Sequence, residues 1–277
     1  MTAAITVSMP PRGLTAPEPV PRVRRRGPPR LSRRNGLSSS SGANTSRAND
    51  GEAQRRYQEQ GFGDRRIGFG RRPALLIVDM QNDFVDEDAP STCSPIARRS
   101  LPAFQRLLDR ARATRIPVLF SQGIVGRDLA DVGLWKSRPH RDGRVQLEGT
   151  RGAEIVDELK PLSTEHVIRK RRPSAFFATD LDMLLRSYSV DTILLAGSSM
   201  SGCVRATAVD AFSRDYRTVI VRECVVDRTQ ALIDNNLFDV DAKYADAISV
   251  DEALAYLRGV AGATEAAKLA SVSGGSQ

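Results

Sequence analysis

The chain has 277 residues, of which 40 % are hydrophobic and 27 % are charged, and its formal net charge is +8. Nearly all of this charge lies in residues 1–50, where nine arginines accompany only two acidic residues, so the rest of the chain is close to neutral. A nearly neutral body does not suggest a groove for nucleic acid. No apolar run approaches the ~20 residues needed to cross a bilayer. We therefore expect neither a nucleic-acid partner nor a membrane span.

The cysteine and histidine content excludes two further classes. Cys93, Cys203 and Cys224 are too few and too scattered for a disulfide scaffold, and none forms a CxxC pair. The two histidines, His140 and His166, therefore have no partners for a zinc site built from His and Cys. This cysteine usage predicts a reduced, cytoplasmic protein.

The two ends of the chain differ from its middle. Residues 1–57 are rich in Arg, Pro, Ser and Gly and lack a hydrophobic period, which predicts a disordered basic extension. A misassigned start codon or a transit peptide are the alternatives for this segment. Residues 261–277 end in Ser-Gly-Gly-Ser-Gln and are expected to form a second disordered tail. One folded domain is predicted between them, over residues 58–260.

Within that domain, apolar runs of strand length alternate with helical patterns. The predicted strands are residues 74–78, 117–121, 166–169, 192–196, 218–221 and 247–249. The predicted helices are residues 96–115, 181–188, 204–214, 232–244 and 251–257. This alternation predicts an α/β fold, a three-layer α/β/α arrangement around a doubly wound, mainly parallel six-stranded sheet.

Reactive groups in such sheets collect at the carboxyl ends of the strands. Asp79 follows the first predicted strand, although it could instead cap a turn, and Asp83 is expected to be a loop or cap acid. Lys170 follows the third strand. It begins a run of three basic residues that would otherwise be read as a solvated edge, and we expect Arg171 and Arg172 to lie in the loop.

Cys203 lies in Gly-Ser-Ser-Met-Ser-Gly-Cys, between the fourth strand and a helix. Small residues allow a sharp turn there, and the first turn of a helix favours the thiolate form of a cysteine. Its backbone donors could also form an oxyanion hole. The alternative, a buried structural cysteine, is preferred for Cys224, and Cys93 is expected to be a loop thiol. The segment is not a GxSxG elbow, and neither GxGxxG nor a Walker motif occurs.

Three motifs, in order and each at a strand end, carry a resemblance to a known family. They are Val-Asp-Met-Gln-Asn-Asp-Phe around Asp79, Lys-Arg-Arg-Pro-Ser-Ala-Phe-Phe from Lys170, and Ser-Gly-Cys-Val-Arg-Ala-Thr-Ala-Val-Asp-Ala around Cys203. Over residues 58–258 the chain resembles the isochorismatase-like cysteine hydrolases. Val-Val-Asp-Arg, ending at Arg228, and the following Asn-Leu-Phe-Asp-Val-Asp-Ala-Lys-Tyr-Ala-Asp resemble the N-carbamoylsarcosine amidase branch.

The resemblance implies a role for each matching residue. Asp79, Lys170 and Cys203 would form a catalytic triad, a cis peptide bond would join Ser198 to Ser199, and the N–H groups of Ser199 and Cys203 would form the oxyanion hole. The implied substrate contacts are Arg228, which would hold a carboxylate, Met200 and Phe177. At position 200 family members often carry a Thr, and the methionine here removes a hydroxyl that could bind the substrate. Residues 123–151 are expected to form a lid or a subunit contact.

The implied activity is hydrolysis of a C–N bond in a small carbamoyl or amide carboxylate, through a cysteine thioester and with release of ammonia. N-carbamoylsarcosine is the first candidate substrate and maleamate the second. The resemblance implies no cofactor and no metal, and a homo-oligomer, either a dimer or a tetramer. The alternative from another class is a non-catalytic binding protein that retains the fold. An isochorismate-type vinyl-ether hydrolase is disfavoured because it would lack the nucleophilic cysteine.

Overall fold

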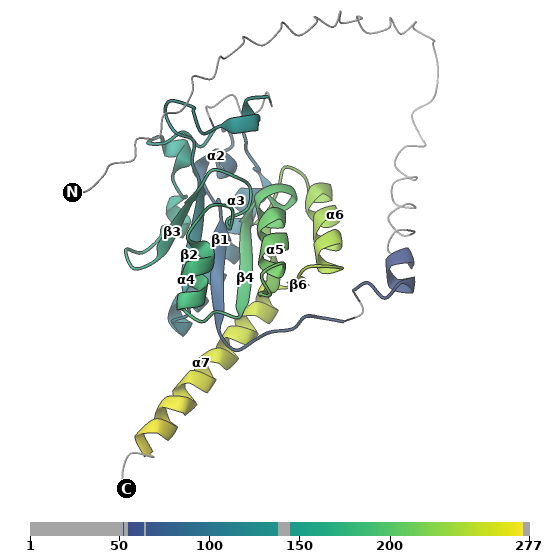
Figure 1. The fold of residues 1–277 in the computed structure, drawn as a ribbon, viewed down its shortest axis with the longest axis vertical. Helices are drawn as coiled ribbons and strands as arrows, with labels where there is room; N and C mark the ends of the chain where they lie inside the picture. Colours follow the sequence, from purple (N-terminus) through teal and green to yellow (C-terminus); the bar gives the residue numbers. More distant parts are fainter. Residues whose placement is uncertain (1–51, 53–54, 64, 138–144, 274–277) are drawn as a thin grey trace, which may run out of the picture. The chain divides into compact units, whose positions relative to one another are not determined.

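The computed structural model describes residues 52, 55–63, 65–137 and 145–273, with side chains to residue 262 (Figure 1). All of these belong to one compact unit, residues 48–277. The predicted basic extension lies almost entirely outside the described residues, so its disorder stays a prediction. Tyr57, placed in that extension from the sequence, packs against Phe62 and Phe238 of the domain, with ring centroids 5.1 and 5.3 Å apart.

A six-stranded, entirely parallel sheet forms the centre of the fold, as predicted. Its strand order is β3-β2-β1-β4-β5-β6. The order reverses at the β1–β4 pair, which makes the sheet doubly wound. The strands are β1 (Pro73–Val78), β2 (Val118–Gly123), β3 (His166–Lys170), β4 (Thr192–Ser198), β5 (Arg217–Val226) and β6 (Asp246–Ile248).

Helices cover both faces of this sheet. They are α2 (Asn82–Val85), α3 (Ile96–Thr114), α4 (Leu181–Ser187), α5 (Arg205–Phe212), α6 (Gln230–Asp241) and α7 (Val250–Ser273). Shorter turns are η1 (Gly133–Ser137), η3 (Arg151–Ala153), η4 (Asp157–Leu159) and the π-helical η5 (Met200–Val204).

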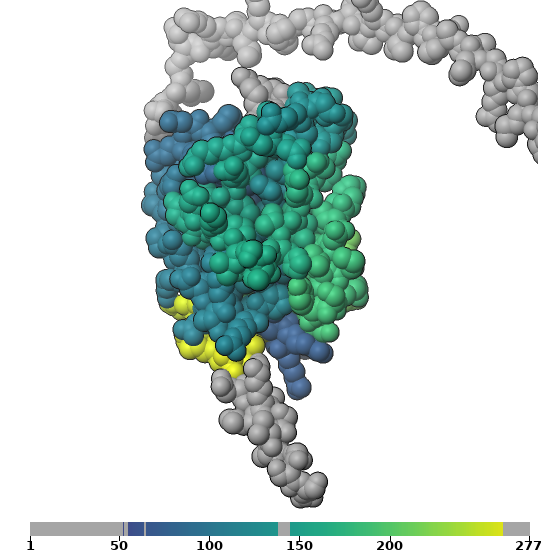
Figure 2. All heavy atoms as spheres, turned by 90° about the vertical axis from the view of Figure 1, so that its left-hand side faces the viewer, coloured from purple at the N-terminus to yellow at the C-terminus, as the bar shows by residue number. Residues whose placement is uncertain are grey.

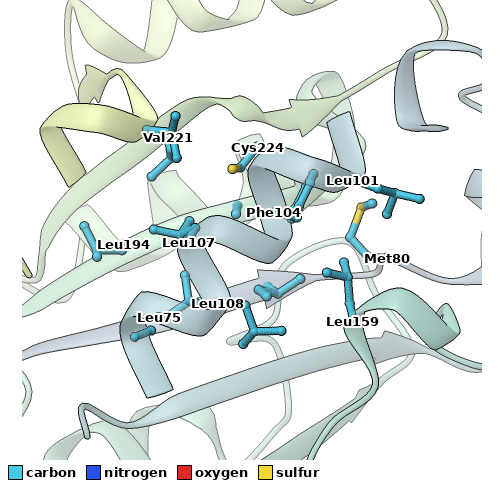
Figure 3. Packing of buried hydrophobic residues seen from close by; sticks show 14 of the residues in the cluster. Leu75, Met80, Leu101, Phe104, Leu107, Leu108, Leu159, Leu194, Val221 and Cys224 are labelled. Carbon is cyan, nitrogen blue, oxygen red and sulfur yellow. The ribbon is translucent and has the colours of Figure 1, made fainter. Parts of the chain in front are cut away.

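Alternate residues of β1 enter two separate cores because successive side chains of a strand point to opposite faces. Leu75 and Ile77 pack with α3 and α7, a core seen from close by in Figure 3. Leu76 and Val78 pack with α4, α5 and α6. This confirms the predicted three-layer arrangement. It also explains why β1 reads as an unbroken apolar run, since all six of its residues are buried.

Two elements extend beyond their predicted limits. Helix α7 continues past Leu257 to Ser273, through residues 261–273 that the sequence analysis assigned to a disordered tail. That prediction gave too much weight to the terminal Ser and Gly residues, because the stretch before them, Ala-Thr-Glu-Ala-Ala-Lys-Leu-Ala, is rich in strong helix formers. Strand β5 runs from Arg217 to Val226 and takes up a bulge in its pairing with β4. Within the described residues no helix is both long and apolar enough to cross a membrane.

Segments between β1 and α4 cover the carboxyl ends of the strands. Gln81 holds two of them: its side-chain amide donates to the carbonyls of Gly123 (2.9 Å) and Ala153 (2.6 Å), and its Oε1 accepts from Gln146 Nε2 at 2.8 Å. Figure 2 shows one side of this covering as blue and teal atoms. In the predicted lid or subunit-contact segment, Gly123 and Gln146 are thus fixed to the carboxyl edge of the sheet by buried hydrogen bonds, while residues 138–144 lie outside the described part of the chain.

Candidate active site

Asp79, Lys170 and Cys203 come together at the carboxyl edge of the sheet. Lys170 Nζ lies 2.6 Å from Asp79 Oδ2 and 3.3 Å from Cys203 Sγ. The three residues are 0, 3 and 7 % exposed. An ammonium group therefore contacts both a carboxylate and a thiol in a site almost closed to solvent, which is the arrangement expected from the strand ends.

The position of Asp79 depends on the neighbouring strand β2. Asp79 leaves β1 with φ +48°, and its N–H donates to the carbonyl of Ser121 at 3.1 Å. The hydroxyl of Ser121 in turn donates to Asp79 Oδ1 at 2.7 Å. The carboxylate is thus held on one oxygen by Ser121 and paired on the other with Lys170. The sequence analysis did not single out Ser121, although its place at the end of a predicted strand was a usable signal.

Cys203 is positioned by the turn that follows β4. Gly197, with φ +133°, brings β4 so close to β1 that a Cβ atom there would lie 2.1 Å from the carbonyl oxygen of Val78. The next peptide bond, Ser198–Ser199, is cis, as expected from the resemblance. The chain then enters η5, which carries Cys203, before α5 begins at Arg205. The predicted helix start at residue 204 is therefore one π-helical turn late.

The charge on Lys170 follows from its two neighbours. Burial alone would lower the pKa of this lysine, but the Asp79 carboxylate and the Cys203 sulfur outweigh it, so that the pKa is raised above its ordinary value. Lys170 also donates to the carbonyl of Arg172 at 3.1 Å. An ammonium beside the sulfur stabilises negative charge on it.

A cavity of about 360 Å³ opens beside Cys203, a size that suits a small molecule. Its lining residues are Pro90, Ser91, Trp135, Pro173, Ser199, Gly202, Cys203 and Arg228. Both residues expected to supply the oxyanion hole, Ser199 and Cys203, thus face it. A larger cavity, about 570 Å³, is lined by Arg71, Pro73 and Arg115 among others and contains none of the predicted site residues.

Arg228 is held at the rim of the cavity by two contacts. Its Nη1 lies 3.3 Å from Asp227 Oδ1, and its Nη2 donates to the carbonyl of Ser91 at 3.2 Å. Asp227, which is fully buried, also accepts from the N–H of Ser201 at 2.8 Å. The guanidinium is therefore fixed to the same turn that carries Cys203. Asp227 was not among the residues expected from the sequence. The one feature that could have indicated its role is its place directly before Arg228.

Two predicted substrate contacts are not at the cavity. Met200 is completely buried in the core beneath α5 and α6, because the η5 turn directs its side chain inward. Phe177 is 58 % exposed and does not line the cavity. Neither side chain lines the cavity, so the structure does not support these two contacts, and they stay predictions that rest on the motif match alone.

Three other residues singled out from the sequence are buried: Cys224, Cys93 and Asp83. Cys224 is fully buried, and burial raises its pKa strongly, in agreement with a structural cysteine. Burial also raises the pKa of Cys93, although Arg228 and the hydroxyl of Ser198 partly oppose it. Asp83 is buried and accepts from the N–H of Gln146, so it secures the covering segment rather than a turn alone. In the described part of the chain no cluster of His, Cys, Asp and Glu could hold a metal ion.

The fold and the site together define a class, the three-layer α/β hydrolases in which a buried lysine and acid accompany a cysteine. The model of the isochorismatase domain matches residues 73–252, so the chain belongs to the isochorismatase family. This is the family whose resemblance the three sequence motifs carry. The chain is accordingly a hydrolase.

Two named amidohydrolases are similar over most of the folded part. An N-carbamoylsarcosine amidase of Arthrobacter is 36 % identical over 206 residues, 73 % of this chain and 76 % of the relative. A maleamate amidohydrolase of Pseudomonas putida is 39 % identical over 206 residues, 73 % of this chain and 95 % of the relative. An isochorismatase family protein of Desulfovibrio vulgaris is 41 % identical, with a TM-score of 0.62 over 67 % of this chain and all of its own. These relatives support a hydrolase that acts on amide bonds.

Proposed function

We propose that the protein hydrolyses the amide C–N bond of a small molecule that also bears a carboxylate, through a thioester on Cys203. The observation that carries the proposal is the contact of Lys170 Nζ with both Asp79 and the Cys203 sulfur, at 2.6 and 3.3 Å. A cysteine becomes a strong nucleophile when a neighbouring cation and a base favour its thiolate.

The proposed reaction has two steps. In the first, the Cys203 sulfur attacks the amide carbonyl and its proton passes to Asp79. Asp79 then gives that proton to the departing nitrogen, so that ammonia leaves and a thioester remains. In the second, Asp79 takes a proton from water, the resulting hydroxide attacks the thioester, and the sulfur leaves and regains the proton. Lys170 keeps its own proton throughout and balances the charge of both partners.

The carbonyl oxygen gains negative charge in each step. We assign its stabilisation to the N–H groups of Ser199 and Cys203, because both residues line the cavity at the end of the η5 turn. Removing one such donor typically costs about 3–4 kcal/mol of barrier. Arg228, at the same cavity, would pair with the substrate carboxylate, which matches a guanidinium in planar geometry.

N-carbamoylsarcosine is the first candidate substrate, and maleamate is the second. Each is the substrate in the name of a relative described above. Both place a carboxylate a few bonds from an amide carbonyl, and both fit a cavity of about 360 Å³. Arg228 would bind the carboxylate of either compound, so only a measurement of turnover distinguishes the two.

The test is ammonia release by the full chain from a panel of small amide and carbamoyl acids, each paired with its methyl ester. We expect turnover of at least one free acid and much slower turnover of its ester. Arg228→Met should raise KM for the acid, whereas Arg186→Met, at a surface ion pair on α4, should leave it unchanged. The proposal fails if no panel member releases ammonia, or if Cys203→Ala releases it at the rate of the unmodified chain.

The alternative from another class is a binding protein that retains the fold. It predicts that the chain binds compounds of the same panel without releasing ammonia from them. The homo-oligomeric state and the cytoplasmic location expected from the sequence stay predictions. Light scattering of the purified chain would test the first of them.

A further inference from the structure

Ser91 is a buried polar residue beside the candidate active site. It lies in the loop between α2 and α3, is 4 % exposed and lines the cavity beside Cys203. Among the described residues its hydroxyl has no hydrogen-bond partner. Buried hydroxyl groups are nearly always hydrogen-bonded, so an unpaired one on a residue that lines a cavity points to a partner inside that cavity.

Other hydroxyls of the same loop are bonded to the protein. The hydroxyl of Ser94 donates to the carbonyl of Val85 at 2.7 Å, and that of Thr92 accepts from the N–H of Ser94 at 2.9 Å. The loop therefore has carbonyl and N–H groups that satisfy hydroxyls where these stabilise its conformation. The unpaired hydroxyl of Ser91 is an exception within its own loop.

The neighbouring Arg228 indicates which ligand group could accept a hydrogen bond from the Ser91 hydroxyl. The Ser91 carbonyl accepts from Arg228 Nη2 at 3.2 Å, and both residues line the same cavity. A carboxylate paired with a guanidinium still has lone pairs free, because its two oxygens offer about four acceptor sites. The hydroxyl, as a donor, matches such an oxygen.

We infer that Ser91 determines substrate specificity by donating a hydrogen bond from its hydroxyl to the carboxylate that Arg228 holds. This inference rests on the proposed function, which supplies the carboxylate. Met200 cannot take this part, because it is completely buried away from the cavity. In this proposal Ser91 and Arg228 bind the carboxylate, and Cys203, which lines the same cavity, attacks the carbonyl.

The first test compares Ser91→Ala with the unmodified chain. We expect KM for the turned-over acid to rise about tenfold or more, the loss typical of a hydrogen bond to a charged group, with kcat little changed. The methyl ester should show no such difference. Ser94→Ala is the matched control, because it removes a hydroxyl from the same loop that does not line the cavity, and its KM should stay at the original value.

A second readout separates specificity from structure. Because the Ser91 hydroxyl is unpaired, Ser91→Ala should leave the melting temperature of the ligand-free protein unchanged or higher. A lower melting temperature together with an unchanged KM would show that Ser91 is structural and would overturn the inference.

A direct binding measurement tests the proposed Ser91 contact without requiring turnover. Maleate, the dicarboxylate that maleamate hydrolysis would produce, serves as the calorimetric probe. If the chain releases no ammonia but maleate binds and Ser91→Ala weakens it about tenfold, the proposed function fails and the Ser91 site stands. If ammonia is released but neither KM nor maleate affinity responds to Ser91→Ala, the proposed function stands and the inference fails. Absence of maleate binding to the unmodified chain also overturns it.

Discussion

Replacing Lys170 with methionine removes a positive charge that contacts both Asp79 and Cys203. At the observed Nζ–Sγ distance of 3.3 Å, Coulomb's law with an effective dielectric constant of about 20 gives on the order of 5 kcal/mol between the ammonium and a thiolate. We therefore expect kcat/KM for ammonia release to fall by about 10³-fold.

The assay requires a folded variant and a control for the loss of a lysine. Thermal unfolding followed by circular dichroism establishes whether Lys170→Met is folded. Lys243→Met removes a lysine that pairs with Asp239 within α6 and its C-terminal turn, away from the cavity, and should leave kcat/KM unchanged. A folded Lys170→Met variant that kept more than a tenth of the activity would refute the argument that the ammonium sustains the reactive sulfur.

Three further outcomes test interactions within the fold, two of them beside the site. Glu165→Gln should lower the free energy of unfolding by about 1–2 kcal/mol at pH 7, because Arg112 donates two hydrogen bonds to this carboxylate and holds its pKa low despite burial. This difference, measured by urea titration, should shrink as the pH falls below 4.5. A carboxylate with a lowered pKa stabilises the folded state fully above its ordinary pKa, and this stabilisation is lost as the carboxylate becomes protonated at lower pH. Gly197→Ala should cost about 3 kcal/mol or more in the same titrations, because its Cβ meets the carbonyl of Val78. Ser121→Ala should reduce kcat about tenfold or more by freeing the Asp79 carboxylate, and an unchanged kcat would exclude that role.

Much of the fold and the three central side chains could be predicted because both depend on local patterns. Strands covered on both faces read as short apolar runs, and β1 and β4 are buried along their whole length. In a parallel sheet the residue that follows such a run lies at a known edge. Asp79, Lys170 and Cys203 were found in this way, and the same reasoning applied to β2 would have found Ser121.

The remaining features depend on contacts between distant segments. Ser91 reaches the cavity from a loop whose place is set by the packing of α2 and α3, and nothing in its own sequence distinguishes it from Ser94. The burial of Met200 could not be predicted, because a π-helical turn, which no spacing rule predicts, directs its side chain into the core. The exposure of Phe177 could not be predicted either, because a motif match gives no side-chain direction. Asp227 matters only through the tertiary contact that fixes Arg228 to the η5 turn.

The most direct test is to trap the bound intermediate. The full chain is mixed with a turned-over amide acid and quenched in acid within a few turnovers, and its peptides are analysed by mass spectrometry. The account predicts an acyl group, the substrate less its ammonia, on the peptide that carries Cys203 and on neither peptide with Cys93 or Cys224. Steady ammonia release with an unmodified Cys203 at every quench time, and the same release from Cys203→Ala, would contradict it.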